Sequence, residues 1–336
     1  FWMMISDYTI HPYRLSFQQP WHSSRGQHNH REGFLVELKD DKGNSAIGEA
    51  APLPEMGSES LQQCHQKLLE MHEVILHCTA EAVLQQLAPY REHYPAFCCA
   101  IESATVMLLA KQQQLTLSQW FNQSSASQLQ LNQITTLQHP VINPNGASVI
   151  KLKVGIAPIE TELKQLQQLA KQLSPKQQLR LDANQAWSFE QASTFLQHLQ
   201  SLPIESIEEP IQNPTLEQFQ QLQQQCHFPI AVDESMQTIG LSPIVESSTL
   251  QRVVLKPMLL GGPQSCFNIA QQLQQAGIEV VITSTLESSI GILSAAHCAA
   301  AIDPHQLQAH GLDTARLFNE DLTLAPTIKN GILHLP

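Results

Sequence analysis

The chain of 336 residues is 42% hydrophobic and 14% charged, which is enough apolar material for one large domain or for a barrel plus a smaller domain. Its formal net charge is −12, and its lysines and arginines are scattered, which argues against a nucleic-acid or anionic membrane surface. The composition therefore predicts a globular protein whose partner is a small molecule.

The cysteines and the first residues bear on the cellular compartment. Seven cysteines, an odd number without a C-x-x-C pair, suggest neither a disulfide framework nor a thiolate zinc site. The first ten positions contain polar and charged residues, and no apolar core of a signal peptide follows. No stretch approaches the roughly 18 uninterrupted apolar residues of a membrane span. We therefore predict a cytoplasmic protein with free thiols and no membrane partner.

The first hundred residues have the pattern of a small α+β domain. Strand-like runs cover residues 9–17, 33–40 and 45–50, with a turn at 41–44 between the last two. Apolar residues at helical spacing predict a helix over 58–76, and Pro95 predicts the start of another helix that reaches about Lys111.

From about residue 131 onward, short β-rich runs alternate with helical patterns. The runs lie at 149–154, 178–182, 205–208, 229–233, 252–256, 279–284 and 307–313, with a weaker one at 131–137. Repeated strand-then-helix units imply a parallel sheet, and eight of them imply a closed (β/α)8-type barrel. An open, doubly wound sheet is the alternative.

Two lysines share one face of the second barrel strand. Alternate residues of a barrel strand point inward, so Lys151 and Lys153 face the interior if the apolar Ile150, Leu152 and Val154 face the helices. Burial and mutual repulsion are expected to lower the pKa of at least one of the two amines toward neutrality. Such a lysine can serve as a base.

Three carboxylates follow on three successive strands, one strand-helix unit apart. Asp182, Glu208 and Asp233 end their runs, and Lys256 ends the next one. Carboxylates that converge on the C-terminal face of a barrel repel one another, and a divalent cation such as Mg²⁺ or Mn²⁺ relieves that repulsion. The spacing predicts a metal site between lysines that lie on opposite sides of a bound carboxylate, which is an acid/base arrangement.

At these positions the chain resembles the enolase superfamily. The motifs of that superfamily stand here as Lys151-Leu152-Lys153, Asp182-Ala183-Asn184, Glu208-Glu209-Pro210, Asp233-Glu234-Ser235 and Lys256-Pro257. The resemblance implies an α+β capping domain (residues 1–100, joined by the C-terminal tail 315–336) over a modified TIM barrel (residues 101–314). Further segments resemble the hydro-lyase branch of the superfamily: Arg31-Glu32-Gly33, Gly48 to Pro54, Leu286 to Gly291 and Gly311-Leu312-Asp313-Thr314.

The resemblance also implies a role for each site residue. Lys153 would remove the proton beside the substrate carboxylate, and Asp182, Glu208 and Asp233 would hold Mg²⁺, which Mn²⁺ could replace. Lys256 would lie across the substrate as a cation, with Lys151, Arg180 and Asn184 in support. Glu209 is expected to lie behind the ligands, because it points away from Glu208.

Other implied features concern substrate binding. Residues 20–31 would form a mobile lid, and the loop at Gly261 and Gly262, together with Ser284 and the helix start at Ser288, would bind substrate carboxylates. The pair His28 and His30 is interpreted as a solvated cluster rather than a metal site, and no G-x-S-x-G accompanies the serines.

Two other functions stay open. The same lysines and carboxylates would serve a racemase or epimerase of dipeptides or N-acylamino acids, although dipeptide epimerases typically have D-x-D where this chain has Gly311-Leu312-Asp313. A barrel that only binds a carboxylate is the third possibility, in which the inward lysine pair has no obvious use. The oligomeric state is not predicted.

Overall fold

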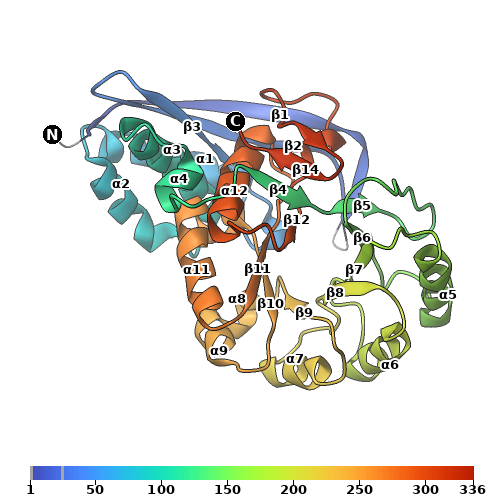
Figure 1. Ribbon diagram of the computed structural model, residues 1–336. Coiled ribbons are helices and arrows are strands. Elements are labelled where there is room, and N and C mark those ends of the chain that lie inside the picture. Colours follow the sequence, from blue (N-terminus) through green and yellow to red (C-terminus); the bar gives the residue numbers. More distant parts are fainter. Residues whose placement is uncertain (1–2, 24–25) are drawn as a thin grey trace.

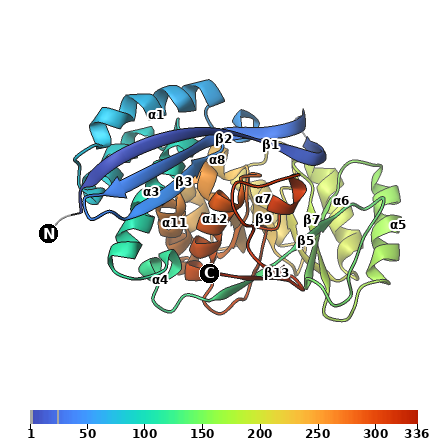
Figure 2. The same cartoon turned by 90° about the horizontal axis from the view of Figure 1, so that it is seen from above.

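The computed structural model describes residues 3–23 and 26–336, and its N-terminal part forms a separate antiparallel sheet (Figure 1). The sheet runs in the order β1 (Ile5–Ser23), β2 (Gly26–Asp40), β3 (Ser45–Ala50), and the long β1–β2 hairpin lies across the molecule in Figure 2. Helices α1 (Leu61–Ile75) and α3 (Pro95–Gln112) pack against this sheet, and α2 (Ala80–Leu87) packs against α3. The predicted α+β domain is present, with strands longer than the apolar alternation indicated.

Local signals explain where these helices begin. The Ser60 hydroxyl accepts a hydrogen bond from the Gln63 N–H, and the Gln63 side chain accepts one from the Ser60 N–H, so α1 has a complete capping box. Pro95 stands at the first position of α3, as predicted. The sequence analysis did not predict α2, although Thr79 caps it with its hydroxyl.

A ring of parallel strands forms the second part of the molecule. Seven strands form one parallel sheet: β5 (Gln133–Thr135), β6 (Val149–Lys153), β7 (Gln178–Asp182), β8 (Ile204–Glu208), β9 (Ile230–Val232), β10 (Arg252–Leu255) and β11 (Glu279–Ile282). An isolated parallel bridge between Thr283 and Gly311 links β11 to β12 (Ala309–His310), which pairs with β4 (Gln128–Leu131). Since β4 leads directly into β5, the ring closes, and the predicted (β/α) barrel is confirmed rather than the open sheet.

Helices follow most of the barrel strands and cover the outside of the ring. Those of this part are α4 (Leu117–Phe121), α5 (Ile159–Ala170), α6 (Phe189–Leu199), α7 (Leu216–Gln223), α8 (Met236–Ile239), α9 (Leu241–Glu246), α10 (Pro257–Leu260), α11 (Pro263–Gln275) and α12 (Ser289–Ile302). Short 3-10 turns occur at η1 (Pro54–Met56), η2 (Ala88–Tyr90) and η3 (Ala315–Leu317). The first barrel strand departs from the repeat, because residues 136–148 form a loop instead of a helix.

The predicted alternation along β6 is confirmed. Ile150 and Leu152 are fully buried in the core between strands and helices, and Val154 is nearly so. Lys151 and Lys153 instead line a cavity inside the ring. In the parallel register Lys151 lies beside Arg180 and Lys153 beside Asp182, so the polar faces of neighbouring strands are in line.

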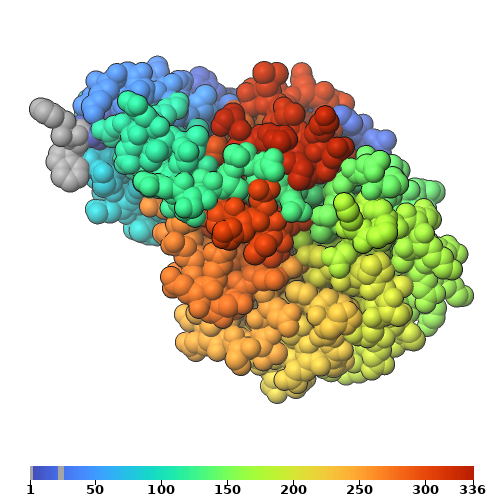
Figure 3. All heavy atoms as spheres, in the orientation of Figure 1, coloured from blue at the N-terminus to red at the C-terminus, as the bar shows by residue number. Residues whose placement is uncertain are grey.

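Helix α3 and the C-terminal tail connect the two parts of the molecule. Helix α3 runs without a break through the predicted boundary at residues 100 and 101, and it packs against both β3 and α10. In the tail, Phe318 pairs with Phe17 of the hairpin, while β13 (Ile328–Lys329) and β14 (Ile332–His334) extend the sheet next to β4. The tail therefore joins both parts, and in Figure 3 its red atoms lie between blue and green ones.

No helix among the described residues is both long enough and apolar enough to cross a membrane.

Candidate active site

A cavity of about 540 Å³ opens at the C-terminal ends of the barrel strands. Its walls come from both parts of the molecule, since Trp21 of β1 and Glu55 and Met56 of η1 line it beside the barrel residues. Among the residues predicted for the site, those that line the cavity are Lys151, Lys153, Asp182, Asn184, Asp233, Lys256 and Ser284. This is the end of a barrel at which active sites occur.

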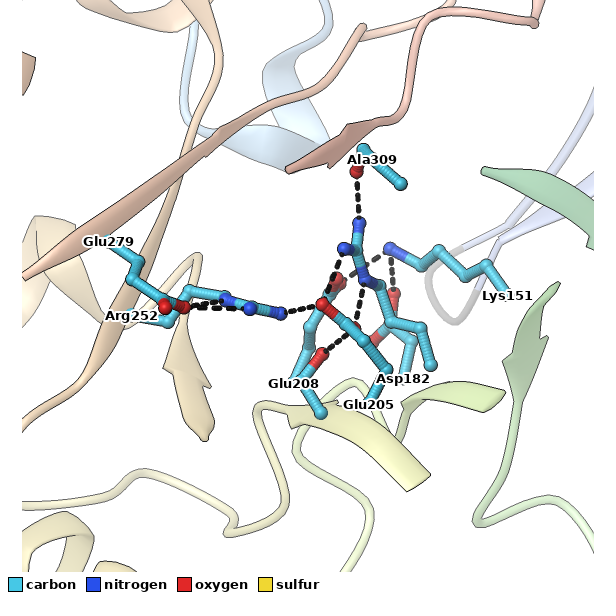
Figure 4. Close-up of polar contacts among 9 residues, drawn as sticks. Lys151, Asp182, Glu205, Glu208, Arg252, Glu279 and Ala309 are labelled. Atoms are coloured by element: carbon cyan, nitrogen blue, oxygen red, sulfur yellow. Dashed lines mark hydrogen bonds and ion pairs between the residues drawn. The ribbon is translucent and has the colours of Figure 1, made fainter. Parts of the chain in front are cut away.

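Lys151 lies between two of the three predicted metal ligands (Figure 4). Its Nζ is 3.0 Å from Asp182 Oδ2 and donates a hydrogen bond to Glu208 Oε2. Glu208 is only 1% exposed and lies behind the lysine rather than in the cavity wall. Burial by itself lowers the pKa of Lys151, but the carboxylates of Asp182 and Glu208 outweigh burial and raise the pKa above its ordinary value. The lowered pKa that was expected for at least one of the two lysines of β6 is therefore not found at Lys151.

Lys256 has a similar environment on the other side of the ring. Its ammonium donates a hydrogen bond to Asp233 Oδ1. Burial lowers the pKa of Lys256, but the negative charge of Asp233 outweighs burial and raises the pKa above its ordinary value.

Lys153 differs from both of these lysines. Among residues 3–23 and 26–336, no carboxylate forms an ion pair with it, although its side chain lines the same cavity. Lys151, Lys153, Asp182, Glu208, Asp233 and Lys256 are named the upper cluster below.

The carboxylates of the upper cluster influence one another. Burial raises the pKa of Glu208, Lys151 opposes that effect, and the negative charges of Asp182 and Asp233 raise the pKa further. Glu234, which also lines the cavity, has its pKa raised to about 8 by burial and by Asp233. Several negative charges thus share a small buried volume, and a cation relieves such repulsion.

The carboxylate oxygens of the upper cluster are of a type that suits a hard divalent cation, although their positions among the described residues are not those of a complete metal site. Within the described ranges, no three carboxylate, histidine or cysteine side chains stand where together they could hold an ion. The ammonium groups of Lys151 and Lys256 instead contact the carboxylate oxygens. Carboxylate oxygens from three adjacent strands are the donor type that Mg²⁺ prefers, so Asp182, Glu208 and Asp233 fit such an ion chemically.

Glu209 holds the loop that carries Asp233. Its side chain is buried and accepts hydrogen bonds from the Asp233 N–H (2.7 Å), the Ser235 N–H (2.9 Å) and the Ser235 hydroxyl. Gln185 Nε2 donates a further bond at 3.1 Å, and burial raises the pKa of Glu209 to about 7. Glu209 is thus placed behind the carboxylates, where the sequence pattern put it.

A second group of charges fills the barrel below the upper cluster. Arg180 donates two hydrogen bonds to Glu205 (2.9 and 3.0 Å) and one to the carbonyl of Ala309 (2.7 Å). Arg252 joins Glu205 to Glu279, as Figure 4 shows. Burial opposes ionisation of Glu205, but Arg180 and Arg252 lower its pKa to about 2. These four side chains, Arg180, Glu205, Arg252 and Glu279, are named the lower cluster.

Arg180 was predicted from the sequence, but its partners were not. The available signal was Arg252, a charge at the start of β10 that pairs with Glu205 of β8 past the single strand β9.

The predicted backbone donors do not face the cavity. The N–H groups of Ser288 and Gly291 donate to the Glu49 carboxylate, and that of Ser289 donates to Asp321, so carboxylates of the protein already occupy the start of α12. Glu102 likewise accepts the N–H groups of Gln264 and Ser265 at the start of α11. Among the described residues that line the cavity, Ser284 is present, whereas Gly261, Gly262 and Ser288 are absent.

The described residues of the segment predicted as a lid, 20–23 and 26–31, belong to β1 and β2. Residues 24 and 25 lie outside the described residues, and Trp21 next to them lines the cavity. His28 contacts Glu55 through Nε2 at 2.7 Å, whereas His30 contacts Arg14 and Glu32 on the exposed side. The two histidines therefore have different partners.

Comparisons with known proteins cover most of the chain. A family described as "Enolase C-terminal domain-like" matches residues 140–336, and one described as "MenC, N-terminal domain" matches residues 5–94. The o-succinylbenzoate synthase of Aliivibrio fischeri is 29% identical over 296 residues, which cover 87% of this chain and 85% of that protein. An L-amino acid-D/L-Glu epimerase of Sulfurimonas denitrificans is 26% identical over 308 residues, which cover 89% of this chain and 90% of that protein.

A solved structure agrees with the fold. The dipeptide epimerase of Enterococcus faecalis V583, complexed with Mg and the dipeptide L-Leu-L-Tyr, superposes with a TM-score of 0.86 at 24% identity. The match covers 99% of this chain and 98% of that one. The relatives carry different activities at similar identity, so they define a family and not a reaction. With its capped barrel, its strand-end lysines and carboxylates, and a family match over more than half of its length, the chain belongs to the enolase superfamily.

Proposed function

We propose that this protein is an o-succinylbenzoate synthase of menaquinone biosynthesis. The reaction is the dehydration of 2-succinyl-6-hydroxy-2,4-cyclohexadiene-1-carboxylate to 2-succinylbenzoate and water, which makes the protein a hydro-lyase. Its partner would be this small carboxylate, and its cofactor would be Mg²⁺, or Mn²⁺ in its place.

One observation at the last barrel strand carries the choice of reaction. Gly311 lines the cavity and has no side chain, while Asp313 is paired with Arg316 at 2.9 Å. A dipeptide substrate brings an ammonium group that needs a carboxylate partner. Neither position of this strand offers one to the cavity, which favours a substrate without an ammonium group.

The three lysines of the upper cluster would have different roles in the reaction. Lys153, the lysine without an ion pair, would take the proton from the carbon beside the ring carboxylate. Lys256 would stand across the ring with its ammonium against the π-face and the developing negative charge. Lys151 would stay protonated beside Asp182 and Glu208, consistent with its raised pKa.

The metal would supply one kind of chemistry. Held by Asp182, Glu208 and Asp233, a divalent cation would add positive charge next to the substrate carboxylate. The departing hydroxyl would receive its proton from the ammonium of Lys153, so the proton removed from carbon leaves with the water and the ring becomes aromatic.

A second function rests on the placement of the two lysines. Lys153 on β6 and Lys256 after β10 lie on opposite sides of the ring, so each could exchange a proton with one face of an α-carbon. That geometry would serve an N-acylamino acid racemase, whose substrate also lacks an ammonium group. A dipeptide epimerase is disfavoured by Gly311 and the Asp313 pair.

The deciding experiment offers both substrates to the protein with Mg²⁺. Formation of the aromatic product from the cyclohexadiene, followed by ultraviolet absorbance, is the expected result. Absence of that product together with racemisation of N-succinylamino acids, followed by polarimetry, would replace the proposal with the second function.

A further inference from the structure

The interior of the barrel has four sides with different chemistry. The order of strands puts the carboxylate strands β7, β8 and β9 on one side, and the lysine strands β6 and β10 on the two flanks. The remaining side consists of β11, β12 and the junction of β4 with β5, so it faces the carboxylates across the cavity. A substrate whose carboxylate lies at the upper cluster would extend toward this fourth side.

Two polar side chains on the fourth side have no hydrogen-bond partner in the described part of the chain. Asn132 is 2% exposed and Thr283 is 7% exposed, and both line the cavity. Neither atom of the Asn132 amide, nor the Thr283 hydroxyl, has a hydrogen-bond partner among residues 3–23 and 26–336. Burying a polar group without a partner is unfavourable, so such groups ordinarily serve a ligand or an ordered water.

The two side chains are neighbours on a fixed frame. A Cβ at Gly311 would lie 2.7 Å from Thr283 Cγ2 and 3.3 Å from Asn132 Oδ1, so both side chains pack closely against the bare glycine and a side chain there would clash with them. The Asn132 N–H donates to the His310 carbonyl at 2.9 Å, and the Thr283 N–H donates to the Leu255 carbonyl at 3.0 Å. Because the backbone bonds hold both residues, their side-chain donors are positioned before a ligand arrives.

The surroundings specify a neutral acceptor. Leu137, Val254 and Leu286 line the same cavity, and the lysines of the upper cluster belong to the flanking strands. A neutral amide and hydroxyl compensate a carbonyl oxygen well but a desolvated carboxylate poorly. We infer that Asn132 and Thr283 form a subsite that binds the carbonyl oxygen of an acyl arm on the substrate. This inference rests on the proposed function, in which that oxygen is the ketone of the succinyl arm.

The test compares two ligands that differ at this oxygen alone. One is the product 2-succinylbenzoate, and the other is 4-(2-carboxyphenyl)butanoate, in which a methylene replaces the ketone. Calorimetric titration with Mg²⁺ present should show that the wild type prefers the ketone by about tenfold, the value of one good hydrogen bond. Thr283→Val and Asn132→Leu should each reduce that preference to about twofold, with unchanged affinity for the methylene ligand.

Matched variants separate binding from folding. Thr283→Ser keeps the hydroxyl and should restore the preference, and Thr194→Val, on the exposed face of α6, should change nothing. An unaltered preference in Thr283→Val and Asn132→Leu, or an equal loss for both ligands, would overturn the subsite.

Failure of the proposed function can be distinguished from failure of the subsite. If the wild type produces no 2-succinylbenzoate but racemises N-succinylamino acids, the same variants are compared on an N-succinylamino acid and on the 2-(3-carboxypropoxy) acid with the same side chain, which is uncharged at the linking atom and keeps both carboxylates but lacks the carbonyl. A selective loss of affinity for the N-succinyl compound would keep the subsite while the dehydration is abandoned. No selective loss in either ligand pair, or no binding of any of the four ligands, would overturn the subsite too.

Discussion

The upper and lower clusters occupy neighbouring layers of the same barrel, yet they differ in how their charges are paired. In the lower cluster, two guanidinium groups saturate Glu205 with directed hydrogen bonds, and its pKa falls to about 2. In the upper cluster, the cations are lysines, and Lys153 has no ion pair within the described part of the chain. Arginine forks fix carboxylates in place, whereas ammonium groups are compact charges that can exchange protons and yield to a metal.

The different pairing indicates that the lower cluster serves the stability of the protein and the upper cluster serves the reaction. The lower cluster should contribute to the free energy of unfolding and little to the reaction directly, while the upper cluster should do the reverse. Four experiments on the protein can test whether the two clusters have these separate roles.

Removal of divalent metal should abolish turnover. A bound cation is worth several kcal/mol of charge stabilisation, so EDTA should reduce kcat by about 10⁴-fold or more. Re-addition of Mg²⁺ or Mn²⁺ should restore the rate, and the melting temperature should shift little because the lower cluster is unaffected. Full activity in EDTA would show that the upper cluster does not need a divalent cation for the reaction.

Lys153→Ala should be the most damaging single substitution among the lysines. A general base contributes about 10²- to 10⁴-fold, so kcat should fall by about 10³-fold in the product assay. Lys164→Ala, an exposed lysine on α5, is the matched control and should retain the wild-type rate. Since Lys153 forms no ion pair with the described residues, unfolding in urea should be almost unchanged. A loss of stability as large as that of a lower-cluster variant would contradict its assigned role.

Glu205→Gln should destabilise the protein without touching the cavity. It removes the charge shared by Arg180, which is fully buried, and Arg252. Leaving buried cations uncompensated costs about 3–5 kcal/mol, which urea unfolding at pH 7 would measure. Glu160→Gln, on the exposed face of α5, serves as control. If the free energy of unfolding were equal for both variants, the lower cluster would have no structural role.

The pH dependence of that destabilisation gives the smallest effect. The folded protein holds the pKa of Glu205 at about 2, below its usual 4.5, because of the two arginines. The stabilisation is therefore complete above about pH 4.5 and is lost as the pH falls toward 2. The stability gap between wild type and Glu205→Gln should stay constant from pH 7 to 5 and then shrink by about 1 kcal/mol per pH unit. A stability gap that widened as the pH fell would contradict a lowered pKa of Glu205 in the folded protein.

Much of the fold and of the upper cluster could be predicted because the barrel repeats. Each strand-helix unit brings its last inward residue to the same face, so Asp182, Glu208, Asp233 and Lys256 could be placed from spacing alone. Lys151 and Lys153 followed from alternation along one strand. The pKa of Lys151 could not be predicted in this way, because it depends on which carboxylates touch its ammonium.

Other features depended on distant partners. The N–H of Ser288 was expected at the substrate, yet it donates to Glu49, which is 239 positions away in the chain. Asn132 and Thr283 carry no motif, and each is an ordinary polar residue at the end of a strand until closure of the ring brings them together around Gly311.

The sequence by itself determined the superfamily, the barrel, and which strand ends carry charge, because hydrophobic alternation and unit length are local properties of the chain. The tertiary structure alone decided which of those charges pair, which lysine of the upper cluster has no ion pair among the described residues, and which buried polar side chains beside the cavity have no partner among them. Those outcomes depend on distances between strands that lie far apart in sequence, and hydrogen bonds and charge interactions fall off over a few ångströms.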